Sequence, residues 1–418
     1  MIMSNYKMAE SNNRIIPTED KIFGINQAAK KMAAEIGEDK VINATVGSLL
    51  DDNGNLVILS SVVEVLKGLN PNDYANYAPI AGTPDFAKAI NRAAFGSYIP
   101  KAYTETVATP GGTGAIRNTI QNYSKRGDQV LTSDWYWGPY NTIAQEIERT
   151  IATFTLTDDQ GKFNTVSFEI KVNELLSKQG SLVIILNTPA HNPTGYSLDL
   201  EDWNNVIRVI KDSVADGKKK LTLLVDVAYL DYAGDEEENR KFFPLLEGLP
   251  DNILVVIAYS LSKSYTMYGM RSGAMICMTG NKEIAEEFKT VCSFSARGTW
   301  SNCNRSAMAT LSNIYSDDDL LAKVTNERRQ YCEMLLRRGK AFQDAANEIS
   351  LDTVPFDAGF FVTVRCENAE AVGLELQKEG IFIVPVGKGL RVSIASISED
   401  KCRSLPPRIL KAINKING

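Results

Sequence analysis

Short apolar runs that alternate with helical segments dominate the middle of this chain. The runs occupy residues 104–109, 129–132, 182–186, 221–225 and 253–258. Runs of this length predict buried strands, and the segments between them have the spacing of helices. Strands that alternate with helices in this way are typical of βαβ units and a mostly parallel sheet. We therefore expect an α/β fold.

Each expected strand is followed by glycine or by polar residues that could do chemistry. The first leads into residues 111–114, which are Gly-Gly-Thr-Gly, and later strands lead to Asn187, Asp226 and Ser260. In open α/β sheets, ligands bind outside the carboxyl ends of the strands. A hydrophobic core needs no such residues at one end of its strands, so a composite site along one edge of the sheet is the better explanation.

The length of 418 residues predicts a large domain with a smaller lobe, because a single core stops growing below this size. Residues 61–320 contain the strand–helix alternation and form the expected large domain. Residues 321–418 predict a small α+β domain that begins with a long amphipathic helical stretch. Residues 1–60, with helical spacing from Thr18 to Gly37, are expected to pack with the small domain.

Composition and charge exclude several classes of protein. Apolar residues make up 44% of the chain and charged residues 23%, as in ordinary folded proteins. The formal net charge of −6 argues against nucleic acid as a partner, because nucleic acid favours a clustered basic face. The longest apolar runs fall far short of the ~20 residues of a membrane helix, and residues 1–13 are polar rather than signal-like. We expect a cytoplasmic protein with no nucleic-acid or membrane partner.

Histidine and cysteine usage narrows the chemistry further. The chain has one histidine, His191, which nearly excludes a His-rich metal site, and no metal is expected. The six cysteines contain no C-x-x-C pair and predict reduced, mostly buried thiols. No G-x-S-x-G or G-x-x-x-x-G-K-[ST] motif supports a hydrolase or a nucleotide-binding loop.

A lysine among anion-binding groups is the main chemical signal. Lys263 follows the expected strand 253–258 and has Ser260, Ser262 and Arg271 as sequence neighbours. Hydroxyls and a guanidinium suit a phosphate, and a lysine beside a phosphate can do covalent chemistry. The alternative interpretation is a solvated loop lysine with an ordinary surface arginine.

The glycine-rich segment 111–114 could complete a phosphate site. A turn of this kind before a helix lets backbone amides, here those of Gly112 and Thr113, face an anion. It is not a dinucleotide fingerprint, because the third glycine of G-x-G-x-x-G would fall on Arg117. A plain tight turn is the alternative interpretation.

A phosphate next to Lys263 suggests pyridoxal 5'-phosphate, whose aldehyde bonds covalently to a lysine amine. This cofactor needs a carboxylate against its ring nitrogen, and Asp226 is the candidate. Tyr229 and Asn192 could reach the ring hydroxyl oxygen, and Trp137 could stack on the ring face. Asp226 could instead be a helix N-cap or turn residue, and Trp137 could be ordinary packing.

Four motifs together resemble fold type I pyridoxal-phosphate aminotransferases, above all the aspartate and aromatic amino acid aminotransferase subgroup of class I/II. They are residues 111–117 (Gly-Gly-Thr-Gly-Ala-Ile-Arg), 191–195 (His-Asn-Pro-Thr-Gly), 226–229 (Asp-Val-Ala-Tyr) and 260–271, with Lys263 and Arg271. The resemblance extends from about Ile42 to Ala395. It implies a large domain with a mostly parallel sheet of the seven-stranded type flanked by helices, a smaller α+β lobe, and pyridoxal 5'-phosphate as cofactor.

The resemblance also implies roles for individual residues. Lys263 would hold the cofactor covalently and move the proton at the substrate α-carbon, with Asp226 and Tyr229 on the cofactor ring. Asn192 and Trp137 would contact both cofactor and substrate. The phosphate would be held by Gly112, Thr113, Ser260, Ser262 and Arg271, and by Tyr77 from the neighbouring subunit. A homodimer with shared active sites follows from the role of Tyr77.

The same resemblance points to a substrate site. Arg391 would bind the substrate α-carboxylate, Gly47 would place its backbone against the substrate, and Phe360 would be the aromatic residue of the small lobe near the pocket. Arg297 resembles the residue that pairs with a side-chain carboxylate across the dimer in the aspartate enzymes. The sequence around it departs from the family pattern, and Arg305 is a competing candidate.

A second departure lies behind the expected ring-binding carboxylate. Tyr140 stands where the aspartate enzymes have a histidine, which leaves the orientation of Asp226 open. Together with Trp135, Tyr136 and Trp137 it forms an aromatic wall that could admit aromatic side chains.

The expected function is transfer of an amino group from an amino acid to a 2-oxo acid such as 2-oxoglutarate, by a ping-pong mechanism. The donor would be aspartate or glutamate, an aromatic amino acid, or both. One alternative is a pyridoxal-phosphate lyase that catalyses β-elimination on the same fold, since fold does not fix function. A further alternative is a non-catalytic sensor that binds the cofactor.

Overall fold

The computed structural model describes residues 7–10, 12, 14–17 and 20–417. The chain divides into two compact units. The large unit comprises Ile58–Pro189 and Leu198–Gln330, and the small unit comprises the residues up to Val57, Ala190–Ser197, and the residues from Tyr331 onward. The three-segment domain division expected from the sequence remains a prediction.

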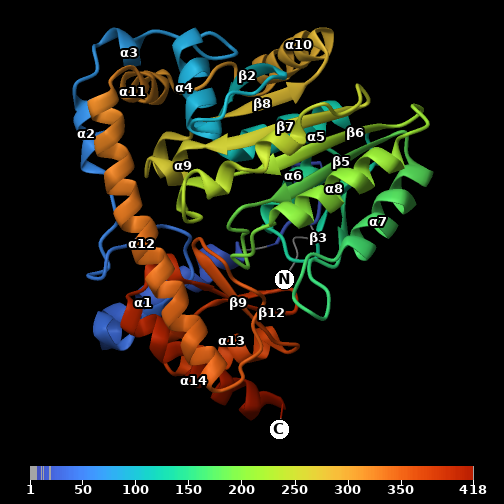
Figure 1. Cartoon of the computed structure of the whole chain (residues 1–418). Helices are drawn as coiled ribbons and strands as arrows, with labels where there is room; N and C mark the ends of the chain where they lie inside the picture. Colours follow the sequence, from blue (N-terminus) through green and yellow to red (C-terminus); the bar gives the residue numbers. More distant parts are fainter. Residues whose placement is uncertain (1–6, 11, 13, 18–19, 418) are drawn as a thin grey trace. The chain divides into compact units, whose positions relative to one another are not determined.

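The large unit is built on a seven-stranded sheet with strand order β2-β8-β7-β6-β5-β3-β4 (Figure 1). Its strands are β2 (Tyr103–Thr109), β3 (Gln129–Ser133), β4 (Thr150–Phe154), β5 (Ser181–Asn187), β6 (Lys220–Asp226), β7 (Ile253–Ser260) and β8 (Gly273–Thr279). Strand β8 is antiparallel to both of its neighbours, and the pairs from β7 to β4 are parallel. The expected mostly parallel α/β sheet is confirmed.

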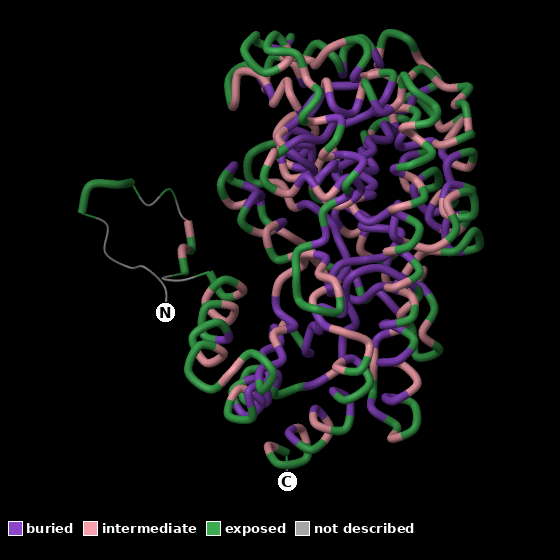
Figure 2. The backbone as a smooth tube through the Cα atoms, turned by 90° about the vertical axis from the view of Figure 1, so that its left-hand side faces the viewer, coloured by how far each residue is buried: buried purple, intermediate pink, exposed green. Residues whose placement is uncertain are grey.

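The helices of the large unit pack on this sheet or on neighbouring elements. They are α2 (Ser60–Lys67), α3 (Asn72–Ala75), α4 (Pro84–Phe95), α5 (Gly111–Tyr123), α6 (Pro139–Glu146), α7 (Thr165–Lys178), α8 (Leu200–Ser213), α9 (Leu261–Ser264), α10 (Lys282–Thr299) and α11 (Arg305–Ser316). Helix α5 packs against β7 and β8, with Ile116 and Ile120 in one apolar cluster with Val256 and Met275. All residues of β7 are buried, in keeping with a central strand covered on both faces. Figure 2 shows buried backbone in the interior and exposed backbone mostly at the outside.

The small unit contains two small sheets. Strand β1 (Ile42–Asn43) pairs in parallel with β10 (Ile381–Phe382), and β11 (Val384–Val386), β12 (Gly389–Ser393) and β9 (Phe361–Arg365) form an antiparallel sheet in that order. Its helices are α1 (Lys21–Ile36), α13 (Ala369–Lys378) and α14 (Glu399–Asn417). Helix α1 is capped by the Asp20 side chain and ends at Gly37, whose φ is 106°. Thr18, expected as the start of this helix, lies outside the described residues.

Helix α12 (Asp318–Glu348) is a single helix where the sequence allowed one or two. Its residues up to Gln330 belong to the large unit, and those from Tyr331 belong to the small unit. The six cysteines are free and buried, and burial raises the pKa of the Cys277 and Cys292 thiols to about 12. Among the described residues, no helix is long and apolar enough to cross a membrane.

Candidate active site

The parallel register of the large unit brings polar side chains to one edge of the sheet. Strand β5 ends at Asn187, β6 at Asp226 and β7 at Ser260. Asn187 pairs with Asp226 across β5 and β6, and Asp226 pairs with Ala258 across β6 and β7. The Asn187 side-chain amide donates to the Asp226 carbonyl oxygen at 2.8 Å. The sequence therefore placed these residues correctly at the carboxyl ends of neighbouring parallel strands.

Asp226 is a buried carboxylate held by two donors, and only 5% of the residue is exposed. The Tyr140 hydroxyl donates to its Oδ2 at 2.6 Å, and the Ala228 amide donates to its Oδ1 at 3.2 Å. Burial raises the pKa of Asp226 to about 6, while both hydrogen bonds oppose that rise. Burial and the nearby carboxylate raise the pKa of Tyr140 well above its usual value, so Tyr140 acts as a neutral donor. The arrangement presents a fixed carboxylate suited to a protonated ring nitrogen.

Trp137 and Tyr136 lie next to this pair. The ring centroids of Trp137 and Tyr140 are 5.6 Å apart in an edge-on arrangement, and those of Tyr136 and Tyr140 are 6.5 Å apart and stacked. The aromatic wall expected from the sequence thus adjoins the Asp226–Tyr140 hydrogen bond.

Lys263 lies on the four-residue helix α9, which directly follows β7. Its Nζ is 4.6 Å from the ring centroid of Tyr268 and 5.8 Å from that of Tyr229. The structure therefore brings Lys263 and Tyr229 together, as the sequence predicted. Tyr268 lies in the 3-10 helix Tyr268–Met270 and was not predicted as a site residue. Its position only five residues after Lys263 could have indicated this contact.

A second group of residues forms an anion cradle next to α9. The Arg271 Nη1 donates to the Ser262 hydroxyl at 3.1 Å and to the Tyr268 carbonyl at 3.0 Å. A Cβ built on Gly111, whose φ is 71°, would lie 2.8 Å from the Arg271 Nη2, so a larger residue there would be strained and would displace the guanidinium. A Cβ on Gly112 would contact the Ser260 Cβ at 3.5 Å.

Helix α5 starts inside this cradle. It begins at Gly111, so residues 111–114 form its first turn, whereas the sequence favoured a turn that precedes the helix. Pro110 at the N-cap supplies no side-chain acceptor, which leaves the amides of the first turn, including those of Gly112 and Thr113, to an anion. Amides, hydroxyls and a guanidinium are the donor set that a phosphate group needs, and together with Lys263 and Asp226 they fit pyridoxal 5'-phosphate.

The small unit holds a different set of expected site residues. Arg391 on β12 is buried, and its Nη2 donates to the Thr45 carbonyl at 2.7 Å. Its Nη1 lies 3.5 Å from the Asn192 Oδ1, at the limit of a hydrogen bond. His191 directly precedes Asn192. Its Nδ1 is hydrogen-bonded to the Thr194 hydroxyl at 2.8 Å, so the single histidine of the chain has a structural role.

Phe361 is the aromatic residue that supports this arginine. The Arg391 guanidinium carbon is 4.4 Å from the Phe361 ring centroid, and a Cβ on Gly47 would meet the Phe361 ring at 2.7 Å. Phe360 is fully buried, with its ring centroid 6.3 Å from that of Phe361. Sequence reasoning missed Phe361, although the pairing of Arg391 with Thr363 across β12 and β9 puts Phe361 on the same face.

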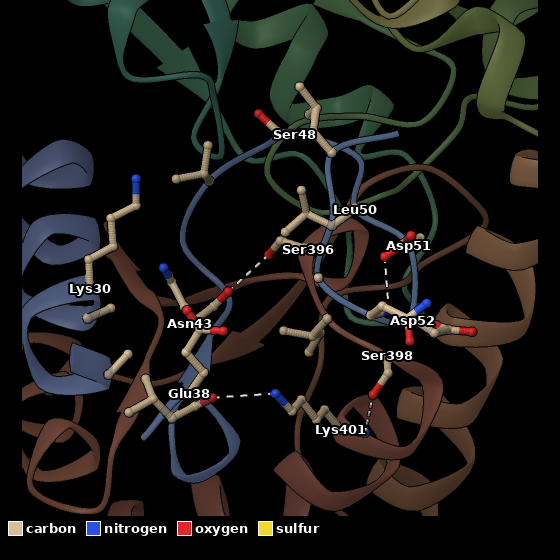
Figure 3. Close-up of a pocket in the computed structure, with 18 of the residues that line it drawn as sticks. Lys30, Glu38, Asn43, Ser48, Leu50, Asp51, Asp52, Ser396, Ser398 and Lys401 are labelled. Atoms are coloured by element: carbon tan, nitrogen blue, oxygen red, sulfur yellow. Dashed lines mark hydrogen bonds between the residues drawn. The ribbon is translucent and has the colours of Figure 1, made fainter. Parts of the chain in front are cut away.

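Hydrogen bonds extend from Arg391 into the wall of a cavity in the small unit. The Thr45 hydroxyl donates to the Asn43 Oδ1 at 2.6 Å, and the Asn43 amide donates to the Asn26 Oδ1 at 2.8 Å. The Ser396 hydroxyl donates to the Asn43 carbonyl at 3.2 Å (Figure 3). The cavity has a volume of about 580 Å³, and its lining includes Asn26, Asn43 and Ser396 but neither Thr45 nor Arg391. The polar wall is thus connected by hydrogen bonds to Thr45, whose carbonyl accepts from Arg391.

Tyr77 and Arg305 form a pair on the surface of the large unit. Tyr77 is 88% exposed, and the Arg305 Nη1 donates to its carbonyl oxygen at 3.1 Å. Arg297 instead donates from Nη1 to the Ser301 hydroxyl at 2.6 Å, at the end of α10. The structure therefore associates Arg305, rather than Arg297, with Tyr77 within one chain.

The fold and these groups define a class of protein: an α/β enzyme with a lysine, an anion cradle and a buried carboxylate at the strand ends, as pyridoxal 5'-phosphate requires. The family described as aminotransferase class I and II matches residues 39–409, and the chain belongs to this family. The family uses pyridoxal 5'-phosphate, so the protein is an aminotransferase of that kind.

Known relatives agree with this assignment. An aminotransferase from Anaerococcus prevotii DSM 20548 has a crystal structure with a TM-score of 0.95 at 38% identity, covering 98% of this chain and 100% of that chain. The aspartate aminotransferase of Escherichia coli K12 is 24% identical over 382 residues, 89% of this chain and 93% of its own. The aromatic-amino-acid aminotransferase of Burkholderia pseudomallei, solved covalently bound to pyridoxal phosphate, shares the fold with a TM-score of 0.80 at 20% identity, covering 98% of this chain and 100% of that chain.

Proposed function

We propose that this aminotransferase moves the amino group of aspartate, glutamate or an aromatic amino acid to 2-oxoglutarate by a ping-pong mechanism. The observation that carries the proposal is the position of Lys263. It lies at the end of a central parallel strand, beside Tyr229, and its short helix is followed by the Arg271 cradle. When bound, the cofactor supplies an aldehyde that condenses with amines and a ring that withdraws electrons from the substrate α-carbon.

The roles proposed for the large-unit residues are those that the family implies, and the chemistry of each side chain suits its role. The Lys263 Nζ would hold the cofactor and, when free, would move the proton at the substrate α-carbon. The Asp226 carboxylate would accept from the ring nitrogen, and its orientation is fixed by the hydrogen bond from Tyr140 to Oδ2. The Tyr229 hydroxyl would bond to the ring oxygen, and Trp137 would stack on the ring. Gly112, Thr113, Ser260, Ser262 and Arg271 bind the phosphate.

The small unit supplies the substrate-binding groups. The Arg391 guanidinium binds the α-carboxylate, and its bond to the Thr45 carbonyl and its contact with Phe361 keep the planar group in one orientation. As the family implies, Asn192 would bond to the cofactor ring oxygen and border the substrate, Gly47 would place its backbone against the substrate, and Phe360 would be the aromatic residue of the small lobe near the pocket.

A homodimer with shared sites completes the proposal. Tyr77 projects from the surface with 88% of its area exposed, which suits a residue that reaches the phosphate of a neighbouring subunit. Arg305 is bonded to the Tyr77 carbonyl, which favours Arg305 over Arg297 as the group that meets a distal carboxylate. The cytoplasmic location remains a prediction.

Replacement of the lysine tests the central assignment. Lys263→Ala should remove both the visible absorbance of the bound cofactor and amino transfer between aspartate and 2-oxoglutarate. Lys211→Ala, at an exposed position on α8, is the matched control and should keep both. Transamination by Lys263→Ala at the wild-type rate would show the assignment to be wrong. Release of pyruvate, ammonia and sulfide from cysteine by the wild type would indicate a lyase instead.

A further inference from the structure

Asp231 is a buried carboxylate that the mechanism above does not use. It lies in the 3-10 helix Leu230–Tyr232, two residues after Tyr229, and its side chain is 1% exposed. Its Oδ1 accepts from the Arg240 Nη2 at 2.7 Å, and its Oδ2 accepts from the Tyr259 hydroxyl at 2.9 Å. The Arg328 Nη1 lies 3.6 Å from Oδ2. All four side chains belong to the large unit.

The charges of this cluster nearly balance. Burial disfavours the charged form, but the guanidiniums of Arg328 and Arg240 outweigh it and lower the pKa of Asp231 below its usual value. Glu236 lies 3.5 Å from Arg328 and 3.8 Å from Arg240, so two acidic groups face two basic ones. A buried ion cluster is weak evidence for stability, because apolar residues of similar volume often stabilise a protein equally well. A buried charged cluster can instead fix the geometry of the segments that it joins.

The cluster joins segments that carry site residues. Tyr259 immediately precedes Ser260, and Asp231 follows Tyr229 by two residues. The Arg328 guanidinium lies 5.8 Å from the ring centroid of Tyr265, which follows Lys263 by two residues. The chain segments on both sides of Lys263 and the segment after Tyr229 therefore meet one charged cluster.

Side chains and backbone of α4, α11 and α12, which are far from α9 in the sequence, contact the same cluster. The Arg240 side chain donates to the carbonyl oxygens of Ala93 and Ala94 near the end of α4, and the Tyr265 hydroxyl is 2.9 Å from that of Tyr315 on α11. Arg328 lies on α12. Helices α4 and α11 have 12 residues each and pack against each other, and α12 has 31, whereas α9 has four, so they can hold α9 in one position.

We propose that Asp231, with Arg328 and Arg240, is a positioning residue that sets the placement of Lys263 and Tyr229 for the reaction at the cofactor. The inference rests on the proposed function of Lys263. Asp231 acts through Tyr259 and the backbone of its own segment, and it does not contact substrate or cofactor itself. Loss of these bonds lets α9 and the segment of Tyr229 move independently, and small displacements of a catalytic group have large effects on rate.

The first test uses a variant that keeps the fold. Tyr259→Phe removes one hydrogen bond to Asp231 without changing the shape of the side chain. In the holoenzyme, we expect the pH midpoint of the visible absorbance of Lys263-bound cofactor to shift by about half a unit or more. We expect kcat to fall about tenfold with KM for aspartate changed less than about twofold. Tyr123→Phe, which removes a partly buried hydroxyl near Cys292, is the matched control and should shift neither the absorbance midpoint nor kcat.

The second test uses the partner cation. Arg328→Met should give the same changes more strongly, and Arg328→Lys should recover part of the wild-type absorbance midpoint. Arg149→Lys is the control, because Arg149 is a buried arginine of the large unit bonded to Ser124 and to backbone carbonyls. A lower unfolding midpoint in urea for every variant, with unchanged absorbance titration and kcat for Tyr259→Phe, would overturn the proposal.

The same data separate this inference from the proposed function. If the wild-type protein shows no absorbance of lysine-bound cofactor, the proposed function fails before Asp231 is tested. If the wild type shows it and Tyr259→Phe titrates identically, only the positioning role of Asp231 fails.

Discussion

Substitution of Tyr140 by phenylalanine tests how the buried carboxylate is held. The Tyr140 hydroxyl donates to the Asp226 Oδ2 at 2.6 Å, and both residues are buried. A hydrogen bond to a charged group is worth about 1.5–3 kcal/mol. Since 1.36 kcal/mol corresponds to one pKa unit, its loss should raise the pKa of Asp226 by about one to two units above its present value.

The sign of the pH effect follows from proton linkage. Aspartate titrates near 3.8 in an unfolded chain, whereas burial raises the pKa of folded Asp226 to about 6. Between these values the folded state binds more protons, so stability falls as pH rises and the loss is complete above the folded pKa. In Tyr140→Phe the folded pKa is higher, so this loss continues to a higher pH. The variant should therefore be about 1.5–3 kcal/mol less stable than wild type in alkaline solution, and closer to it in acid, where Asp226 is neutral and its hydrogen bond weaker.

Unfolding of the cofactor-free protein in urea at about pH 5 and about pH 9 measures this difference. Tyr136→Phe is the matched control, because Tyr136 stacks on Tyr140 and its own pKa is raised by burial alone. Its effect on stability should be the same at both pH values. An equal loss for Tyr140→Phe in acid and in alkali would refute the view that this hydroxyl stabilises a charged Asp226.

Three further substitutions examine the anion cradle and the substrate site. Gly111→Ala places a methyl group 2.8 Å from a guanidinium nitrogen of Arg271, at a φ of 71°. In fluorescence titrations, the dissociation constant of this variant for pyridoxal 5'-phosphate should rise about tenfold or more. Gly127→Ala is the control, because φ is 86° there and nothing lies within 4 Å, and it should leave the dissociation constant unchanged. Arg391→Lys keeps the charge but loses the planar fork, so kcat/KM for all amino acids should fall about 10- to 100-fold, and an unchanged value would exclude Arg391 from carboxylate binding. If Arg305 meets a distal carboxylate, Arg305→Ala should lower the ratio of kcat/KM for aspartate to kcat/KM for tyrosine about tenfold or more. Arg297→Ala should leave this ratio unchanged. A fall of the ratio in Arg297→Ala alone would assign the carboxylate to Arg297 instead.

The sequence predicted the parts of the sheet with strong local signals. Strands β5, β6 and β7 are continuous apolar runs, and their ends at Asn187, Asp226 and Ser260 agree with the structure. It did not identify β4 and β8. Strand β4 lies at the sheet edge and is only partly buried, and β8 reads Gly-Ala-Met-Ile-Cys-Met-Thr, with little β-branched content. Strands of this kind are fixed by their neighbours rather than by local propensity.

The site shows the same division between local and long-range information. Lys263, Arg271 and Asp226 could be assigned from motifs, because their roles depend on residue type and order. The position of Phe361 beneath Arg391 depends on the pairing of β9 with β12, and the hydrogen bond from Tyr140 to Asp226 joins residues 86 positions apart. Contacts of this separation are set by packing, which one sequence does not reveal without the register of the strands.

Backbone strain around the lysine indicates that its orientation is imposed by the fold. Thr266 and Arg271 both have φ of 51°, a left-handed conformation that costs non-glycine residues about 1–3 kcal/mol each. Specific bonds hold both residues: the Thr266 hydroxyl accepts from the Leu59 amide at 3.1 Å, and the Arg271 guanidinium donates to Ser262 and to the Tyr268 carbonyl. Two such residues within nine positions of Lys263 would not persist if any loop conformation served equally well. The strained turn and the buried charges at Asp231 therefore act on the same short segment, and both restrict the backbone that carries the Lys263 side chain.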